Sequence, residues 1–415
     1  MKLNRSIRWT KIGLALLAGV VLLGCQKDSV QPEPSARLRN LSSAEQELVR
    51  SINDFTFDLV RQATRQQSSD NVFLSPLSIN LAMSLMLNGA AGETQAQLLK
   101  SLDADVLSPS EINKAYSELM PFLAQLDPQV NFSLANAVWY DLRYTMTPLY
   151  RDVLLAYYDA HTLDLNFRSR RAPSIIQKWI ENQTHYSVPT LPATLNSGTA
   201  LYLTNTVQFN GKWAFPFRKE YTRPAEFFLP NGNSITTDMM YADQAAYRYY
   251  QNEQAAFIDV PYGNQQYSMT FVMPQTEDSL YQLANALNAD ELQSILSQAD
   301  TLEQGLYLPK FAINYQASLK NTLSQLGMGL AFQDSADFSQ FFTETTHPPH
   351  MQDLVHQASI SINEVGTHAV SVTSNLPAGG DLPSVRIDRS FLFFIREQHT
   401  GVILFAGVLS NPELL

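Results

Sequence analysis

The chain has 415 residues, of which 45% are hydrophobic and 16% charged, as is typical of a globular protein with a large core. The length exceeds that of most single domains but fits one large α/β unit. The net charge of −11 argues against nucleic acid as a partner and against electrostatic binding to anionic lipid, because both require a basic surface.

The N-terminus has the pattern of a bacterial lipoprotein. Four basic residues lie in residues 2–11, an apolar run follows in residues 12–23, and the four residues that end at Cys25 resemble a lipobox. The alternative of a transmembrane helix is disfavoured, because the apolar run is short and ends in polar residues. We expect cleavage before Cys25, which is the only cysteine, and lipidation of that residue. The net charge of the mature chain would be −15, and Gln26 predicts the outer membrane or cell surface as its location.

The sequence therefore divides into three predicted segments. Residues 1–24 are a signal peptide, residues 25–39 are a lipidated N-terminus and flexible tether, and residues 40–415 form one folded domain. The tether contains Pro32 and Pro34 among polar neighbours and has no hydrophobic period.

Capping residues mark the first helices of the domain. Ser42 and Glu45 are typical of a helix start, and they precede apolar residues at helical spacing, namely Leu48, Ile52, Phe55 and Leu59. A second helix is predicted to begin at Pro76, with Ser75 as its cap. Gly89 would end that helix, and Thr94 is a candidate cap for the next one.

Strands and helices alternate through the middle of the chain. Residues 132–140 predict a buried strand, and residues 175–187 predict a helix. Residues 201–209 are almost continuously β-prone, so we expect a strand with both faces buried, followed by a turn at Asn210–Gly211.

From residue 227 onwards, short strands and turns dominate. The remaining predicted strands are residues 258–263, 267–273 and 306–311, and the remaining predicted helices are residues 280–296 and 319–327.

Residues 364–381 combine a strand with a loop. Alternation places only small residues on one face, Thr367, Ala369, Ser371 and Thr373, so this strand could slide between two others. Pro377, Gly379 and Gly380 predict a loop after it. By itself, the stretch is also consistent with an ordinary edge strand and hairpin loop.

The order of these motifs resembles the serpin family. The resemblance rests on residues 71–94, 201–217, 355–367 and 387–412, and it covers roughly residues 40–412. It implies an α+β fold with a large mixed central β-sheet, two smaller sheets, about eight or nine helices and an exposed reactive loop.

The resemblance also implies specific site residues. The hinge of the loop would comprise Glu364, Gly366, Thr367 and Ala369. A polar cluster that controls opening of the sheet would comprise Ser75, Ser78, Asn205 and His356, with His356 bridging Asn205. The alternative for His356 is a surface histidine. Trp213 would lie at the top of the sheet, where insertion begins.

The implied function is irreversible inhibition of serine or cysteine endopeptidases. The protease would cut the loop, form an acyl-enzyme, and be trapped as the loop inserts into the sheet. Counting from Gly366 places the reactive bond at Gly380–Asp381, whereas counting back from Phe391 places it at Gly379–Gly380. Glycine before the cut favours elastase-like, subtilisin-like or papain-like targets over trypsin-like ones.

Two features depart from the family pattern. Val370 and Val372 are bulkier than the alanines that are common in this segment of the family. Pro377 lacks a backbone N–H, so it would interrupt the hydrogen bonds between strands near the far end of the inserting segment. The alternative function is therefore a non-inhibitory serpin-like surface binding protein whose loop is merely cleaved.

The sequence gives little support for enzymatic, phosphate-binding or metal-binding chemistry. The sequence has no Gly-x-Ser-x-Gly elbow and no glycine-rich phosphate loop. His347, His350 and His356 are close in sequence, but Pro348 and Pro349 break any helix between them, so no metal site is expected. We expect a monomer without cofactor, and not a turnover enzyme.

Overall fold

The computed structural model describes residues 38–66, 71–184, 200–276, 279–343, 350–351, 353–367 and 383–413. All of them belong to the second of two compact units, Ala36–Leu415. The predicted signal peptide, Cys25, most of the tether, Ala369 and the reactive bond at Gly379–Asp381 lie outside the described residues.

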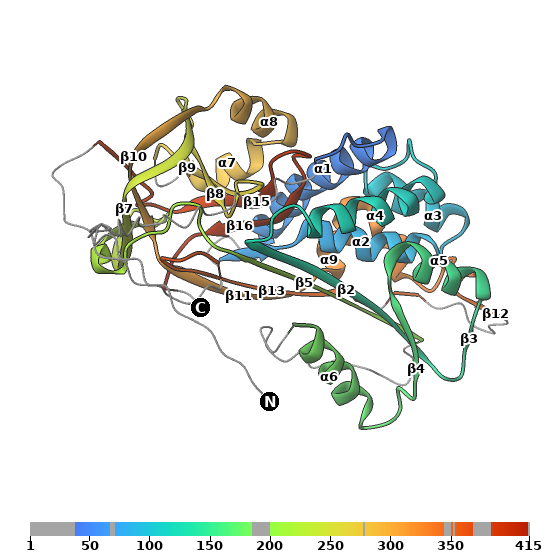
Figure 1. The fold of residues 1–415 in the computed structure, drawn as a ribbon. Helices are drawn as coiled ribbons and strands as arrows, with labels where there is room; N and C mark the ends of the chain where they lie inside the picture. The colour runs from blue at the N-terminus through green and yellow to red at the C-terminus, as the bar shows by residue number, and fades with distance from the viewer. Residues whose placement is uncertain are drawn as a thin grey trace, which may run out of the picture. The chain divides into compact units, whose positions relative to one another are not determined.

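The described residues contain nine α-helices (Figure 1). They are α1 (Ser43–Gln66), α2 (Pro76–Leu87), α3 (Gly92–Ser101), α4 (Pro109–Ala124), α5 (Pro148–Tyr158), α6 (Ala172–Thr184), α7 (Leu280–Ala286), α8 (Ala289–Gln298) and α9 (Lys320–Leu323). Short helical turns follow α9 at Ser324–Met328 and Gly329–Phe332, and another lies at Lys219–Tyr221. None of these helices combines the length and the apolar character that crossing a membrane requires.

The first two helices begin where their caps predict. The Ser42 backbone N–H donates to the Glu45 carboxylate at 2.8 Å, while the Ser42 hydroxyl accepts from the Glu45 backbone N–H at 3.3 Å, which is a capping box. The predicted apolar residues of α1 are all buried. Ser75 caps α2 by accepting from the Ser78 backbone N–H at 3.3 Å, and Pro76 occupies the first turn.

Two helix predictions are wrong in detail. Thr94 does not cap α3, because it lies inside the helix and its hydroxyl accepts from the Asp337 backbone N–H at 2.8 Å. The single helix predicted over residues 280–296 is two helices, α7 and α8. Asn288 adopts an extended backbone between them and caps α8 by accepting from the Glu291 backbone N–H at 2.9 Å.

The largest sheet has nine strands. Its order is β1 (Val72–Leu74), β16 (Ile403–Leu409), β15 (Phe391–Glu397), β9 (Tyr267–Pro274), β8 (Ala255–Tyr262), β7 (Ser234–Gln251), β10 (Asp300–Pro309) and β14 (Ser384–Arg386), with β6 (Arg223–Phe228) also paired to β7. The β10–β14 pair is parallel and the other pairs are antiparallel. Strands β8, β9, β15 and β16 are buried almost throughout and form the centre of the core.

Two further groups of strands carry the site. One is the three-stranded group β4 (His161–Leu165), β2 (Val130–Asp141) and β5 (Leu201–Gly211), and the other is the antiparallel pair β11 (Phe311–Ser318) and β13 (Val355–Ile362). The group is mixed, since β2 runs parallel to β4 and antiparallel to β5. A small pair, β3 (Thr145–Met146) and β12 (Phe342–Thr343), forms a separate two-stranded sheet. Helix α2 packs on one side of β5 and α6 on the other (Figure 1).

The predictions for β5 are partly wrong. Most of β5 is half-buried rather than buried on both faces. Among the described residues, Ile176 and Ile180 of α6 pack in one apolar cluster with Tyr202, near the start of the strand. The turn predicted at Asn210–Gly211 does not form, because β5 continues through Gly211, opposite Val130.

Candidate functional site

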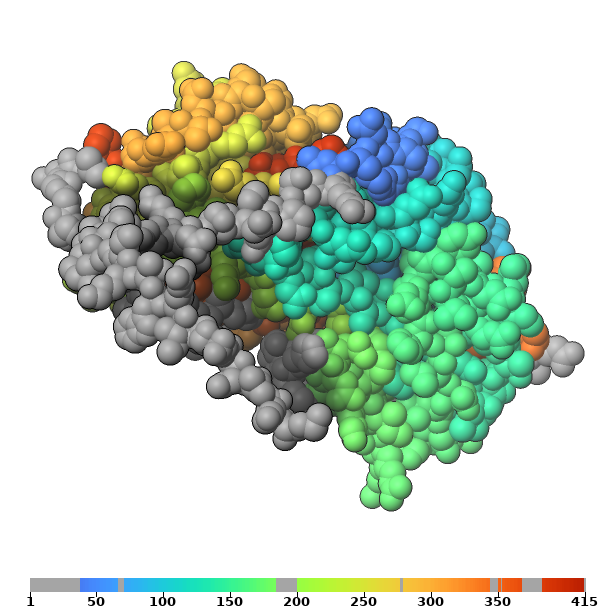
Figure 2. Space-filling model, in the orientation of Figure 1, coloured from blue at the N-terminus to red at the C-terminus, as the bar shows by residue number. Residues whose placement is uncertain are grey.

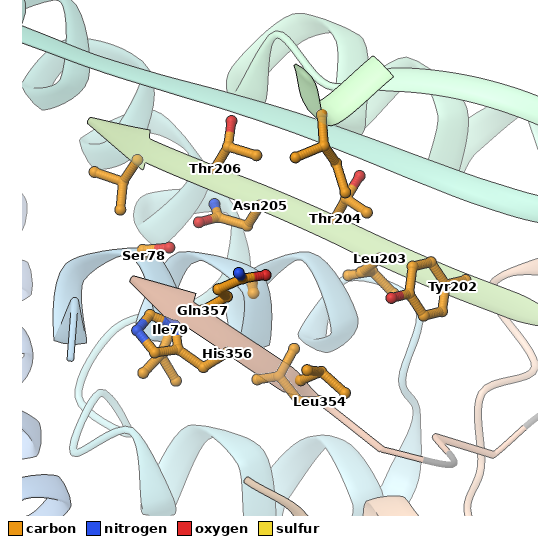
Figure 3. A pocket seen from close by; sticks show the side chains of 14 residues that line it. Ser78, Ile79, Tyr202, Leu203, Thr204, Asn205, Thr206, Leu354, His356 and Gln357 are labelled. Carbon is orange, nitrogen blue, oxygen red and sulfur yellow. The ribbon is translucent and has the colours of Figure 1, made fainter. Parts of the chain in front are cut away.

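A slot separates β5 from β13. Among the described residues, β5 pairs only with β2 and β13 pairs only with β11, so the facing edges of the two strands carry no ladder. Residues 202–210 of one strand and 354–360 of the other line continuous cavities between them. Figure 3 shows the two strands side by side, with Asn205 and Gln357 lying between them. We call this space the slot.

Helix α2 forms the floor of the slot and carries part of the predicted polar cluster. Ser78 lines the slot together with Asn205 and His356 (Figure 3), whereas Ser75 lies at the N-terminus of the helix. The Ser75 backbone N–H donates to Nε2 of His356 at 3.2 Å, and its hydroxyl donates to the Leu404 carbonyl at 2.9 Å. The structure thus brings all four cluster residues to one end of the slot.

His356 is buried, with 6% of its surface exposed, so the surface alternative is excluded. Burial disfavours the charged imidazolium and lowers the pKa of His356 to about 4. The ring is therefore neutral at physiological pH. Its Nε2 accepts a hydrogen bond from Ser75, so the proton is assigned to Nδ1.

The predicted bridge between His356 and Asn205 is not formed in this structure. The Asn205 amide donates to Oδ1 of Asn136 at 2.5 Å, within the β2–β5 pair, and its own Oδ1 is buried without a hydrogen-bond partner. The physical reason is the slot itself, because His356 turns toward α2 while Asn205 stays with β2. A buried, unsatisfied acceptor costs about 1–3 kcal/mol.

Thr367 closes one end of the slot. Its backbone N–H donates to the Gly211 carbonyl at 2.8 Å, and the residue also forms an antiparallel bridge to Ile362 of β13. Its side chain is 1% exposed, and its hydroxyl lies 2.8 Å from the Tyr262 hydroxyl. Thr367 therefore contacts the ends of both strands that flank the slot.

Gly366 is required by a close approach of two backbones. A Cβ atom at this position would lie 2.0 Å from the Gly211 carbonyl oxygen and 2.7 Å from the Lys212 Cα, and the residue has a φ of +154°. No other residue fits here without moving the end of β5.

Glu364 anchors the hinge to the nine-stranded sheet. Its carbonyl accepts from the Phe217 N–H at 2.9 Å, and its carboxylate accepts from the Thr222 hydroxyl at 2.9 Å and pairs with Nζ of Lys310 at 3.4 Å. Burial alone would raise the pKa of this carboxyl group, but its own backbone N–H, Thr222 and Lys310 together hold the pKa below its usual value. Glu364 is therefore ionised at neutral pH.

Trp213 holds the turn that precedes Thr367. Its backbone N–H donates to the Val365 carbonyl at 2.8 Å, and its indole N–H donates to the Asn363 carbonyl at 3.0 Å. Its ring stacks on Tyr262 with centroids 4.3 Å apart. Trp213 thus lies at the end of β5, beside the mouth of the slot.

Sequence reasoning missed several partners of the hinge, among them Tyr262, Lys310 and Asn363. Tyr262 ends β8 and Lys310 lies between β10 and β11, so their contacts with the hinge depend on how distant strands pack. Asn363 offered a local signal, because asparagine is common in turns. Its Oδ1 accepts from the backbone N–H groups of Val365 and Gly366.

No metal centre emerges from the part of the chain that the structure describes, where no three His, Cys, Asp or Glu residues gather in a way that could hold an ion. His350 lies 3.3 Å from an Asp334 carboxylate oxygen, His347 falls outside the described residues, and His356 is buried at the slot.

Comparisons with known proteins agree on one family. A model described as serpin (serine protease inhibitor) matches residues 50–412. Alpha-1-antitrypsin 1-3 of Mus musculus is 27% identical over 413 residues, which cover 98% of this chain and 99% of that protein. An uncharacterized serpin-like protein of Thermococcus kodakarensis is 28% identical over 400 residues, which cover 93% and 91%.

Solved structures show the same architecture. The thermophilic serpin tengpin in its native state matches with a TM-score of 0.82 and 25% identity, covering 91% of this chain and 97% of that one. Human thyroxine-binding globulin in complex with thyroxine matches with a TM-score of 0.80 and 24% identity, covering 89% and 100%. The α+β fold predicted from the sequence motifs is thereby confirmed.

Proposed function

The chain belongs to the serpin family of serine protease inhibitors, and we propose that it is an irreversible, single-use inhibitor of serine endopeptidases, with papain-like cysteine endopeptidases as further targets. The observation that carries the proposal is the slot between β5 and β13, with Thr367 already bonded at its mouth. We further propose that it acts as a monomer and has no turnover activity of its own.

The slot has the properties of a site for one additional strand. Among the described residues, β5 and β13 do not pair with each other across the slot, which supports the proposal that a further strand enters between them. An entering backbone would also bring N–H donors near the unsatisfied Oδ1 of Asn205. The segment that follows Thr367 has a face of small side chains, which suits passage over the buried floor that α2 forms.

In the proposed mechanism, the protease performs all the bond chemistry. Its nucleophile attacks the carbonyl carbon of Gly380, the bond to the Asp381 nitrogen breaks, and the protease base returns the proton to that leaving amine. The new ester keeps the protease attached to the segment that begins at Thr367. Insertion of about 14 residues at ~3.3 Å each would carry the protease ~46 Å and distort its active site before water hydrolyses the ester.

A gel experiment tests this proposal. The protein is mixed with elastase, subtilisin or papain and then denatured in detergent. We expect a covalent band at the summed mass of the two proteins, and no such band with an elastase whose catalytic serine is replaced by alanine. If each active protease yields only clipped protein, the rival function of a non-inhibitory surface binding protein is supported instead.

We also propose that the mature protein is a lipoprotein of the cell envelope, at the outer membrane or cell surface. The support comes from the sequence: the basic and apolar regions of residues 2–23 and the lipobox that ends at Cys25. Cys25→Ala should move the protein from the membrane fraction to the soluble fraction and abolish its labelling with a radioactive fatty acid. Labelling that persists in this variant would contradict the assignment.

A further inference from the structure

A row of stacked side chains crosses the nine-stranded sheet next to β14. The guanidinium carbon of Arg386 lies 4.1 Å from the centroid of the Tyr307 ring, and Tyr307 stacks on Tyr241 with centroids 4.4 Å apart. Tyr221 follows at 6.1 Å from Tyr241, and Arg218 lies over its ring at 5.3 Å. The strand register explains the row, because Tyr307 lies opposite both Arg386 on β14 and Tyr241 on β7.

This row forms one wall of a pocket of about 370 Å³. The buried Met239 and the half-buried Ala225 contribute apolar surface, and Arg223 and Asp243 complete the lining. The volume lies at the lower end of the range for small-molecule sites, which suits a ligand of one or two rings. The pocket opens beside β14, which reaches the surface next to β10 at the upper left of Figure 2.

The charges of the pocket favour an anion. Asp243 is engaged by Arg218, with a distance of 3.6 Å between the charged atoms. Arg223 and Arg386 are exposed, and neither forms an ion pair with a carboxylate of the described residues. Among the described residues, Arg223 donates a hydrogen bond to the Thr222 carbonyl alone, at 2.8 Å, and the Arg386 guanidinium contacts the Tyr307 ring alone. These two guanidinium groups place positive charge at the pocket of a chain whose net charge is −11.

From this geometry we propose that the pocket binds a planar aromatic carboxylate. The aromatic ring would pack against the tyrosine row and Met239, and the carboxylate would take paired N–H donors from Arg386 or Arg223. Arginine suits this role because its planar, permanently charged fork matches a carboxylate. A neutral analogue of the same shape gains only the packing and leaves both cations unpaired.

Binding would also stabilise β14. This strand has three residues and pairs with β10 only at Gly305–Ser384, Leu306–Val385 and Tyr307–Arg386. A ligand held by Arg386 and by the tyrosines of β7 and β10 adds a tie between β14 and its neighbours. We expect slower hydrogen exchange of the backbone amides in residues 384–386 when the ligand is bound.

Calorimetry on the full-length protein tests the proposal with 2-naphthoate and its uncharged analogue 2-naphthamide. At low salt, one equivalent of naphthoate should bind, and naphthamide should bind roughly tenfold more weakly. Arg386→Gln and Arg223→Gln should each weaken naphthoate binding by about fivefold, the effect of losing one charge-assisted contact. Arg170→Gln, which changes an exposed arginine that does not line the pocket, should leave binding unchanged.

Three results would overturn the proposal: no binding of naphthoate, equal binding of acid and amide, or wild-type binding by an Arg223→Gln/Arg386→Gln double variant. Both arginines are exposed, so these variants should fold, and an unchanged thermal midpoint checks this. The measurement needs no protease, so its outcome is independent of the proposed inhibitory function.

Discussion

Thr367 is closely surrounded at the mouth of the slot. Its hydroxyl meets that of Tyr262, its N–H is bonded to Gly211, and the preceding Gly366 leaves no room for a Cβ. Thr367 is 1% exposed, so a longer side chain at position 367 would be buried as well. The residue is therefore a sensitive probe of whether the segment enters the sheet at this point.

Thr367→Arg should convert the inhibitor into a substrate. A guanidinium group buried beside Tyr262 without a counter-ion costs several kcal/mol, so insertion slows while cleavage continues. The moles of protein consumed per mole of protease inhibited should rise, because a cost of about 1.4 kcal/mol in the barrier to insertion already raises the ratio of substrate-like release to trapping roughly tenfold. Thr367→Ser keeps the hydroxyl and should behave like the wild type. An unchanged stoichiometry in the arginine variant would contradict the position assigned to Thr367.

His356 should make stability depend on pH. Its pKa is about 4 in the folded protein and 6.5 in a free histidine, so the unfolded chain binds the proton more readily. The neutral form is fully populated in both states only well above pH 6.5, and stability is lost as the pH falls through 6.5 toward 4. The loss amounts to at most roughly 3 kcal/mol.

Urea unfolding at pH 7.5 and at pH 4.5 measures this effect. His356→Gln should show a smaller difference between the two midpoints than the wild type, because glutamine does not titrate. His161→Gln, an exposed residue of β4, should retain the wild-type difference. If His356→Gln and the wild type lose the same stability on acidification, the buried histidine is not the group that titrates.

The site residues show which features can be predicted from a sequence. Glu364, Gly366, Thr367 and Trp213 were expected at the hinge because of the resemblance to the serpin family, and they lie together at one end of β5. The bond from Ser75 to His356, in place of the bridge to Asn205, was not foreseen. Its formation depends on the separation of two strands, which no local pattern encodes.

At the scale of elements, capping residues and hydrophobic periodicity predicted the helices well, whereas the burial of strands was harder to predict. Ser42 and Ser75 start α1 and α2 as expected, because capping depends on neighbours within three residues. The half-burial of β5 was not predicted, since it depends on which distant elements pack over the strand. An apolar run of residues shows what can be buried, but not what will cover it.

The reactive bond should lie in the segment between two ordered anchors, Thr367 and β14. The Arg386–Ile387 bond is not expected to be a cleavage site for trypsin-like enzymes. Arg386 lies within β14, Ile387 is buried, and the Ile387 N–H donates to the Tyr307 carbonyl at 2.9 Å. Residues 367–383 contain no lysine or arginine. Enzymes with a small primary pocket remain as the expected partners.

Mass spectrometry of the peptide released on reaction with elastase or subtilisin locates the cut. We expect a new amino terminus at Asp381, or at Gly380 under the alternative count. Trypsin serves as the control and should form no covalent complex. A terminus at Ile387, or one within residues 367–374, would show that both counts are wrong.

At the scale of the whole molecule, we propose that the slot stores free energy. Among the described residues, β5 and β13 form no ladder with each other, and the Oδ1 of Asn205 is left unsatisfied. The buried centre of the nine-stranded sheet, by contrast, is paired on both sides. In the proposed mechanism, a cut in the loop releases a segment that fills the slot.

Cleavage of the loop should therefore raise the thermal midpoint of the protein. If about 14 new backbone hydrogen bonds contribute about 1 kcal/mol each, the cleaved form gains roughly 14 kcal/mol. With an unfolding entropy of about 2.1 cal/mol/K per residue, this gain corresponds to an increase of roughly 15–20 °C for a domain of this size. Differential scanning calorimetry of intact and cleaved protein measures the shift. Thr367→Arg, cleaved at the same bond, is the matched control and should gain much less, because its hinge cannot enter the sheet. Cleaved wild-type protein that melts at or below the intact form would mean that the slot is not filled by the loop.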